Sequence, residues 1–401
     1  NMHVSLDSAL GRQRRLNSVG DSVLQIAPNA AAAYSLRSLT GGDPKVVRVR
    51  RVIDNAESDF TAAGISSGAL TSFVNDIQTV GTAVNGTGSF DNYTVSNLST
   101  TGFSADNSAG GTGSAGFPYV FKDEDVLVVK YTVTNFSSTA SLSPQIRGVS
   151  ATNSVTGKTN SGTAFTANGT YTDVLTATAD GTHLMFADDN TGSYTISDFE
   201  IVSYLSSGFV ETWYDQSGNS NDAVQETAGS QPKIVSAGVL VVLSDVPALL
   251  FDESFFVAAG FAFSPSGDFL AVTVSKLSSN NFIDTRDGGS DGFFIQQGSS
   301  AFRYRYNGDG SIDVSGKDEH IIATAELNGT TLTAYKNGSS AGTDTVTAGL
   351  STTTPLSIGK VAFSGANTLA GSVQEVILYD TDKSANRETL ETNIINHYGI
   401  S

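Results

Sequence analysis

The stretch IIATAELNGTTLTAYKNG (321–338) indicates which class of fold this sequence encodes. Two runs of apolar and β-branched residues lie on either side of Asn328-Gly329, and Asn337-Gly338 closes the second run. An Asn-Gly pair between two such runs is a strong local signal for a β-hairpin, because both residues tolerate the positive φ angles of tight turns. The stretch therefore predicts consecutive antiparallel strands.

Further strands are predicted on both sides of this hairpin. Alternating or continuous apolar residues mark them at 269–274, 302–306 and 373–379. A helix is predicted after Ser384, because apolar residues then recur on one helical face at Leu390, Ile394 and Tyr398. Residues 236–401 are therefore predicted to form a β-sandwich that ends in a helix.

Composition agrees with a mainly β protein. The 401 residues include 41 glycines, and only 15% of the residues are charged. There is no cysteine, which excludes thiolate metal sites and cysteine nucleophiles. A net charge of −18 argues against a nucleic-acid partner, and no apolar run is long enough to predict membrane insertion.

The charge is unevenly distributed along the chain. Residues 1–51 hold eight of the 22 Lys and Arg residues but only three of the 40 Asp and Glu residues, a local net charge of +5. Residues 1–27 are predicted to be an attachment arm, in which Arg12, Arg14 and Arg15 would contact an acidic partner. The alternative is a basic surface with no partner.

The middle of the chain predicts a second sandwich within a split unit. Strand patterns separated by turn signals recur through 81–205, and we expect an inserted β-sandwich like a carbohydrate-binding module. The flanking residues 28–80 and 206–235 would form one small unit packing on the C-terminal sandwich. Within it, Pro28 and the alanines that follow predict a short helix that ends near Leu39.

Three segments carry a family resemblance: 30–51 with 54–60, 211–225 with 230–238, and 371–400. Together they resemble virion and tail-fibre-like proteins of tailed phages that carry a concanavalin-like (laminin G-type) jelly-roll module. The resemblance implies that fold for 236–401, a virion location, other virion proteins as partners and a homo-oligomer, often a trimer. It also implies binding of host-surface polysaccharide.

The first two segments also resemble the catalytic domain of α-L-arabinofuranosidase B, through ETWYDQSGNSND (211–222). That family has adjacent cysteines beside the sugar and a catalytic Glu and Asp. The nearest stretch here, NFIDTRDGGSDG (281–292), offers Asp284, Asp287 and Asp291 but no Glu. Retaining glycosidases need two carboxyl groups about 5 Å apart with one of them protonated. We therefore predict that the protein is not an enzyme.

The same three aspartates are candidate ligands for calcium, the one cofactor that the sequence suggests, since Ca²⁺ is bound by oxygen atoms. A solvated turn is the alternative. Trp213, Tyr214, Asp215 and Asn219 are candidate sugar-binding residues, because an aromatic ring beside amide and carboxylate groups suits a sugar. The alternative is a buried tryptophan followed by a turn that aspartate stabilises.

Arg303 and Arg305 are predicted on the face of their strand opposite to its aromatic residues, where they would meet an acidic glycan or a neighbouring subunit. Protection of an exposed strand is the alternative. The predicted function is a phage virion protein that is anchored by its basic N-terminal region and displays glycan-binding sandwiches. A capsid or tail decoration protein without glycan recognition, and an arabinofuranosidase-like hydrolase, are the alternatives.

Overall fold

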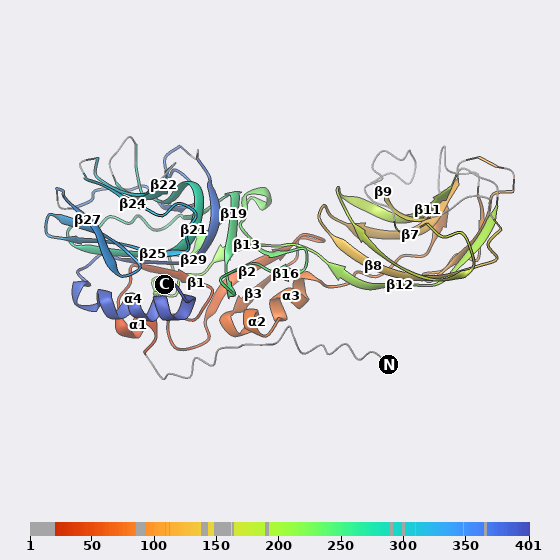
Figure 1. Ribbon diagram of the computed structural model, residues 1–401, viewed down its shortest axis with the longest axis horizontal. Helices are drawn as coiled ribbons and strands as arrows, with labels where there is room; N and C mark the ends of the chain where they lie inside the picture. Colours follow the sequence, from red (N-terminus) through yellow and green to blue (C-terminus); the bar gives the residue numbers. More distant parts are fainter. Residues whose placement is uncertain are drawn as a thin grey trace.

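A computed structural model describes residues 21–85, 93–108, 110–111, 113–137, 143–147, 162, 164–188, 192–288, 292–298, 301–308, 310–347, 349–364 and 367–401. Figure 1 shows two bodies, both built mainly from antiparallel strands. We call the first of them the body; it contains the elements before residue 75 and after residue 207. We call the second the insert; it contains the strands between Val84 and Leu205. The predicted fold class, mainly β with a second sandwich and a few short helices, is confirmed.

The first sheet of the body is antiparallel throughout. Its strands follow the order β1 (Ala32–Ser35), β29 (Leu369–Tyr379), β21 (Phe269–Asp284), β25 (Ile321–Asn328), β26 (Thr331–Lys336) and β27 (Ser339–Thr345). The predicted hairpin is present as β25 and β26, with Gly329 at φ +61° in its turn. Asn337 and Gly338, both at positive φ, form the turn that follows β26.

The second sheet shares strand β21 with the first. Its order is β20 (Phe256–Ala258), β28 (Leu356–Ile358), the C-terminal part of β21, β22 (Phe293–Gln297), β23 (Ala301–Tyr306) and β24 (Gly310–Ser315). Strand β21 pairs with β29 as far as Ser279 and with β22 from Asn280 onward. Asn280 has φ +68°, so the strand changes sheets at a residue in the left-handed region, which asparagine tolerates better than most residues.

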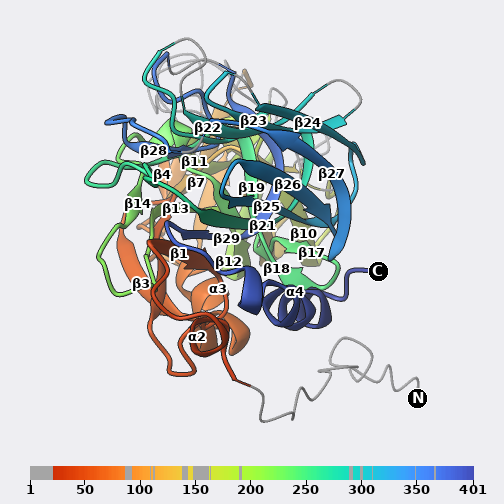
Figure 2. The same cartoon turned by 90° about the vertical axis from the view of Figure 1, so that its left-hand side faces the viewer.

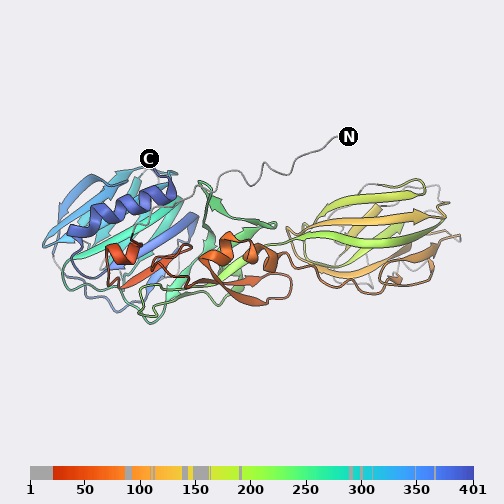
Figure 3. The same ribbon diagram turned by 90° about the horizontal axis from the view of Figure 1, so that it is seen from below.

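Helices cover the outer face of the first sheet. Figure 2 shows three successive layers: the second sheet with β22–β24, the first sheet with β25, β26 and β29, and the helix α4 (Ser384–Tyr398). Figure 3 shows α4 and the short helix α1 (Val23–Ile26) lying across the strands of the first sheet. Leu390 and Ile394 of α4 pack with Val272 and Ile377 of the sheet in one buried apolar cluster. Because a helix layer lies on one side and the sandwich core on the other, β29 is apolar along most of its length.

The remaining strands of the body extend the sandwich and share its main core, in which Trp213 contacts Tyr34 and Phe256. These elements are β2 (Lys45–Arg51), β3 (Glu57–Thr61), α2 (Ala62–Ser66), α3 (Ala69–Val74), β13 (Gly208–Trp213), β14 (Ala223–Val224), η3 (Ala228–Ser230), β15 (Lys233–Ser236), β16 (Val239–Leu240), β17 (Val242–Leu243), β18 (Val246–Pro247) and β19 (Leu249–Ser254).

The helix predicted after Pro28 is wrong. Residues 32–35 form strand β1, which pairs with Glu375–Leu378 of β29, and the nearby helix α1 ends before the proline. Alanine favours helices in isolation, but pairing along the free edge of β29 satisfies the backbone of this buried segment. Tertiary pairing therefore overrides the local preference.

The insert is a sandwich of two antiparallel sheets. One has the order β4 (Val84–Asn85), β7 (Gly113–Phe121), β11 (Gly181–Asp188), β9 (Ser143–Arg147). The other has the order β10 (Gly169–Thr176), β8 (Val126–Thr134), β12 (Ser193–Leu205), β6 (Phe103–Asp106), β5 (Thr94–Ser96). Aromatic rings fill the core, with Phe103 against both Phe117 and Phe186. An ion pair of 2.8 Å between Lys233 of the body and Glu124 of the insert braces the junction.

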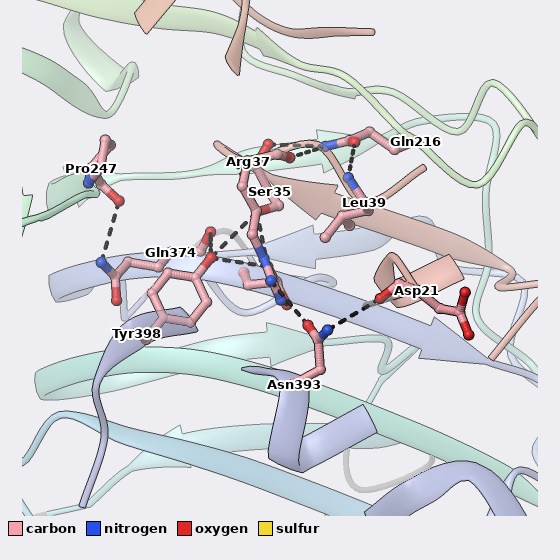
Figure 4. Close-up of polar contacts among 10 residues, drawn as sticks. Asp21, Ser35, Arg37, Leu39, Gln216, Pro247, Gln374, Asn393 and Tyr398 are labelled. Carbon is pink, nitrogen blue, oxygen red and sulfur yellow. Dashed lines mark hydrogen bonds and ion pairs between the residues drawn. The ribbon is translucent and has the colours of Figure 1, made fainter. Parts of the chain in front are cut away.

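A buried polar cluster fixes both terminal segments to β29 (Figure 4). The carboxylate of Glu375 accepts hydrogen bonds from the Ser35 hydroxyl at 2.9 Å, from the Tyr398 hydroxyl at 2.9 Å and from two nitrogens of Arg37 at 2.8 and 3.0 Å. We call Ser35, Arg37, Glu375 and Tyr398 the clasp. It links β1, the segment after β1, the sheet and the C-terminal helix.

Candidate functional site

The Trp213 segment has a structural role in this fold. The Trp213 ring is fully buried in the main core, so it has no face accessible to a sugar. The Tyr214 hydroxyl donates a hydrogen bond of 2.7 Å to Asp59. Desolvation, together with that hydrogen bond, raises the pKa of Tyr214. These contacts favour the alternative interpretation, a core tryptophan followed by a stabilised turn.

Asp215 and Asn219 hold the loop that follows β13 against the segment around β1. Asp215 accepts hydrogen bonds from the Ala33 amide at 2.8 Å, from Ser217 at 2.6 and 2.9 Å, and from the Asn221 amide at 3.0 Å. The Asn219 side chain donates to the carbonyl of Ala30 at 2.9 Å. The loop therefore satisfies backbone groups of β1 that face away from β29.

The predicted calcium ligands are not assembled as a metal site in the described part of the chain. Asp284 is fully buried and forms an ion pair with Arg286, whose side chain also stacks on Phe294. Asp287 lines a separate hollow, and Asp291 lies outside the described residues, as do Arg12, Arg14 and Arg15. Among the described residues no group of three or more His, Cys, Asp or Glu side chains could hold a metal ion. Calcium binding stays a prediction.

A polar pocket lies where strand β21 changes sheets. We call it the switch pocket; its volume is about 370 Å³, and its lining residues are Ser278, Ser279, Asn280, Asn281, Gln296, Gln297, Gly298, Lys317 and Asn367. All of these except the glycine have hydroxyl, amide or ammonium groups. The hydroxyl and amide groups can both donate hydrogen bonds to and accept them from a polyhydroxylated ligand, and the ammonium group can donate them.

Several lining side chains are held in place by the fold. The Asn280 amide donates to the Thr368 carbonyl at 2.9 Å, and the Asn281 amide donates to Asp284 at 2.8 Å. Gln297 is 4% exposed and donates to two carbonyls of its own hairpin, while its Oε1 has no hydrogen-bond partner. The side chains of Asn280, Asn281 and Gln297 are therefore held in fixed positions by the surrounding backbone and by Asp284.

The predicted arginines lie on the sheet face that borders this pocket. Gln296 pairs with Arg303 across β22 and β23, and Phe294 pairs with Arg305. Arg303 forms a bidentate ion pair with Asp313 at 2.6 and 2.8 Å. The hydrogen bonds from Arg303 lower the pKa of Asp313, and the charge of Arg305 contributes to the same shift. Alternation along 302–306 thus places both arginines on the outer face, as predicted.

Sequence reasoning missed most of the switch pocket. Ser278-Ser279-Asn280-Asn281 is a run of four polar residues within a mainly apolar strand, and this run was the available signal. The run did not indicate that Gln296 and Lys317 would lie beside it, because their positions depend on the pairing of β21 with β22 after Asn280.

None of the helices in the described part of the chain is long and apolar enough to cross a membrane.

Comparison with known proteins supports the fold. Residues 253–387 match the family model of the concanavalin A-like lectin/glucanase superfamily, of the laminin G type. With the sandwich topology, this match shows a concanavalin-like jelly-roll fold for the C-terminal part of the body. No curated protein matches the chain.

Three similar solved structures have low sequence identity. The binding domain of a paraclostridial mosquitocidal protein is 15% identical, with a TM-score of 0.36 over 46% of this chain and 50% of its own. An arabinofuranosidase complexed with arabinofuranosyl-α-1,2-xylobiose is 14% identical, with a TM-score of 0.34 over 47% and 51%. Domains LG4-5 of the mouse laminin α1 chain are 10% identical, with a TM-score of 0.30 over 65% and 85%. This chain thus spans about half the length of the first two structures.

Proposed function

We propose that the protein binds carbohydrate through the switch pocket without cleaving it. The observation that carries this proposal is the concentration of amide and hydroxyl side chains in one pocket of a lectin-type sandwich. Each sugar hydroxyl both donates and accepts a hydrogen bond, and side-chain amides offer both functions. Because Asn280, Asn281 and Gln297 are fixed by hydrogen bonds, little conformational entropy is lost when a ligand binds.

The proposal excludes hydrolysis at this pocket for a chemical reason. Glycosidases of the retaining and inverting classes use two carboxyl groups beside the scissile bond. The described residues that line the pocket include neither Asp nor Glu, and the neighbouring Asp284 is bound to Arg286. We expect no turnover of aryl arabinofuranosides, measured as release of the aryl group by the 401-residue chain. Release above the rate without protein would favour the hydrolase alternative.

The binding proposal is tested by replacing Gln296 with alanine. Its side chain lies on the rim, and the substitution removes one amide from the pocket. Loss of one or two hydrogen bonds is expected to weaken binding about tenfold. The measurement is a multivalent glycan array, followed by titration of the best ligand with wild type and Gln296→Ala.

The matched control is Thr343→Ala, an exposed residue on β27 outside the pocket. It is expected to bind as wild type does. Failure of the wild type to bind any glycan on the array would reject carbohydrate binding. Equal affinity of wild type and Gln296→Ala would reject the switch pocket as the site.

We also propose that the chain is displayed on a virion, with its basic N-terminal region toward acidic partner proteins. Arg12, Arg14 and Arg15 of the basic N-terminal region and the attachment of β1 through the clasp support this arrangement. A homo-oligomer would present several pockets together and raise a weak affinity through avidity. Mapping of the chain in the assembled particle tests the proposal. Burial of both sandwiches between subunits would favour the decoration alternative.

A further inference from the structure

An exposed aromatic ring lies close to the switch pocket. Phe363 is 47% exposed, which is unusual for a large apolar side chain in the jelly roll. The Arg286 guanidinium lies 5.5 Å from the centre of this ring and 3.9 Å from the centre of the Phe294 ring. Arg286 is itself fixed by its ion pair with the buried Asp284. Phe363 is therefore supported on one side by a fixed cation.

The ring and the pocket are connected through two shared elements of the fold. Phe363 and Asn367 come from the same connection between β28 and β29, and Asn367 lines the pocket. Phe294 and Gln296 lie two residues apart on the same face of β22, which corresponds to about 7 Å along the strand. The surface from Gln296 to Phe363 is thus long enough for more than one sugar ring.

The same surface carries positive charge in a strongly acidic chain. The charges of Arg286 and Arg303 are balanced by Asp284 and Asp313. Arg305, beside Phe294, forms no ion pair within the described part of the chain, and Lys317 on the pocket rim forms none either. Two cations without ion-pair partners, beside amides and an exposed ring, suit a ligand that has hydroxyl groups, an apolar ring face and an acidic group.

We propose that this surface binds an acidic glycan of at least two sugar residues. One ring stacks on Phe363, another residue of the same glycan occupies the switch pocket, and an acidic group is recognised by Arg305. The proposal rests on carbohydrate binding at the switch pocket and identifies the class of ligand. Aromatic stacking supplies affinity that does not depend on charge, whereas Arg305 supplies the preference for an acidic sugar.

The experiment compares tetragalacturonate with its fully methyl-esterified form, which differ in charge but share the same sugar backbone. Affinities are measured by calorimetry for the 401-residue chain and two variants of it, Phe363→Ala and Arg305→Gln. We expect wild type to prefer the acidic form about tenfold, and Phe363→Ala to bind both forms about tenfold more weakly. Arg305→Gln should lose the preference and keep its affinity for the ester.

Matched controls are Val242→Ala, another exposed apolar residue of the body, and Lys130→Gln, an exposed cation on β8 of the insert, both outside this surface. Thermal melting of each variant identifies any loss of folding. The proposal is overturned if Phe363→Ala binds like Val242→Ala, or if wild type binds the acid and the ester equally. If either result is found but Gln296→Ala still weakens glycan binding, the proposed function stands and only the acidic-glycan proposal fails. If wild type binds no glycan, both the acidic-glycan proposal and carbohydrate binding are rejected.

Discussion

Replacing Arg37 with methionine is expected to lower the free energy of unfolding of the body by about 3–5 kcal/mol at neutral pH. The substitution leaves the Glu375 carboxylate fully buried with only the Ser35 and Tyr398 hydroxyls as partners. An ionised carboxylate that has lost its cation inside a protein is strongly destabilising. Urea unfolding followed by fluorescence measures the effect on the body alone, since the single tryptophan, Trp213, lies in the body's core.

The sign of the contribution that Glu375 makes to the pH dependence should reverse in this variant. In the wild type, desolvation raises the pKa of Glu375, but the charge and hydrogen bonds of Arg37 outweigh it and the net pKa is lowered. The clasp therefore stabilises the protein above the unfolded pKa of about 4.3, and this contribution is lost as the pH falls. Without Arg37 the desolvation remains, so the pKa of Glu375 rises, and the contribution of this one group should favour folding as the pH falls.

His397, beside the clasp, acts in the same direction in the wild type. Burial, with the nearby charge of Arg37, lowers the pKa of His397 to about 4. The unfolded chain therefore binds a proton more readily between about pH 6.5 and 4, and stability falls as the pH falls through that range. We therefore expect the free energy of unfolding of the wild type to decrease as the pH falls, because both Glu375 and His397 contribute in that direction.

The double variant Arg37→Met with Glu375→Gln is the control for the clasp. Removing both charges leaves no buried ion, so much of the lost stability should return and the pH dependence of Glu375 should disappear. A single Arg37→Met variant as stable as the wild type would mean that Glu375 reaches solvent in solution. A double variant no more stable than the single variant would mean that packing of the Arg37 side chain, rather than its charge, holds the segment after β1.

Local patterns predicted the strands but not the site. The Asn-Gly turns and the alternation that places Arg303 and Arg305 outward depend on neighbours in the sequence, so the sequence contained the information. The switch pocket depends on Asn280 adopting a positive φ and on β21 changing sheets there. Which strand pairs with the second half of β21 is a long-range outcome that no local pattern specifies.

The β1 segment shows that a local pattern can also predict the wrong element when distant residues decide the structure. Its alanines have a local preference for helix, yet the edge of β29 and the loop around Asp215 make it a strand. The sequence left both a sugar site and a stabilised turn open for the Asp215 loop, because the residue types that bind hydroxyl groups also bind backbone groups. Residue type alone does not distinguish these two roles, and the positions of the Ala33 amide and the Ala30 carbonyl decide between them.

Replacing Asp215 with alanine is expected to lower the free energy of unfolding by about 2–4 kcal/mol and to leave glycan affinity unchanged. The substitution removes the acceptor of the Ala33 and Asn221 amides and of Ser217, and it frees the loop from β1. Asp215→Asn keeps one acceptor oxygen, so its loss should be smaller. The measurements are urea unfolding and titration with the best ligand from the glycan array.

The matched control is Glu226→Ala, which removes an exposed carboxylate a few residues beyond the same loop. It should change neither the free energy of unfolding nor the glycan affinity. The two interpretations of the Trp213 segment predict opposite results for Asp215→Ala. A stabilising loop predicts lower stability with unchanged binding, because the partners of Asp215 are backbone and side-chain groups of the protein itself. Unchanged stability with lost binding would instead indicate that Asp215 and Asn219 bind the sugar. It would also contradict the switch pocket as the binding site.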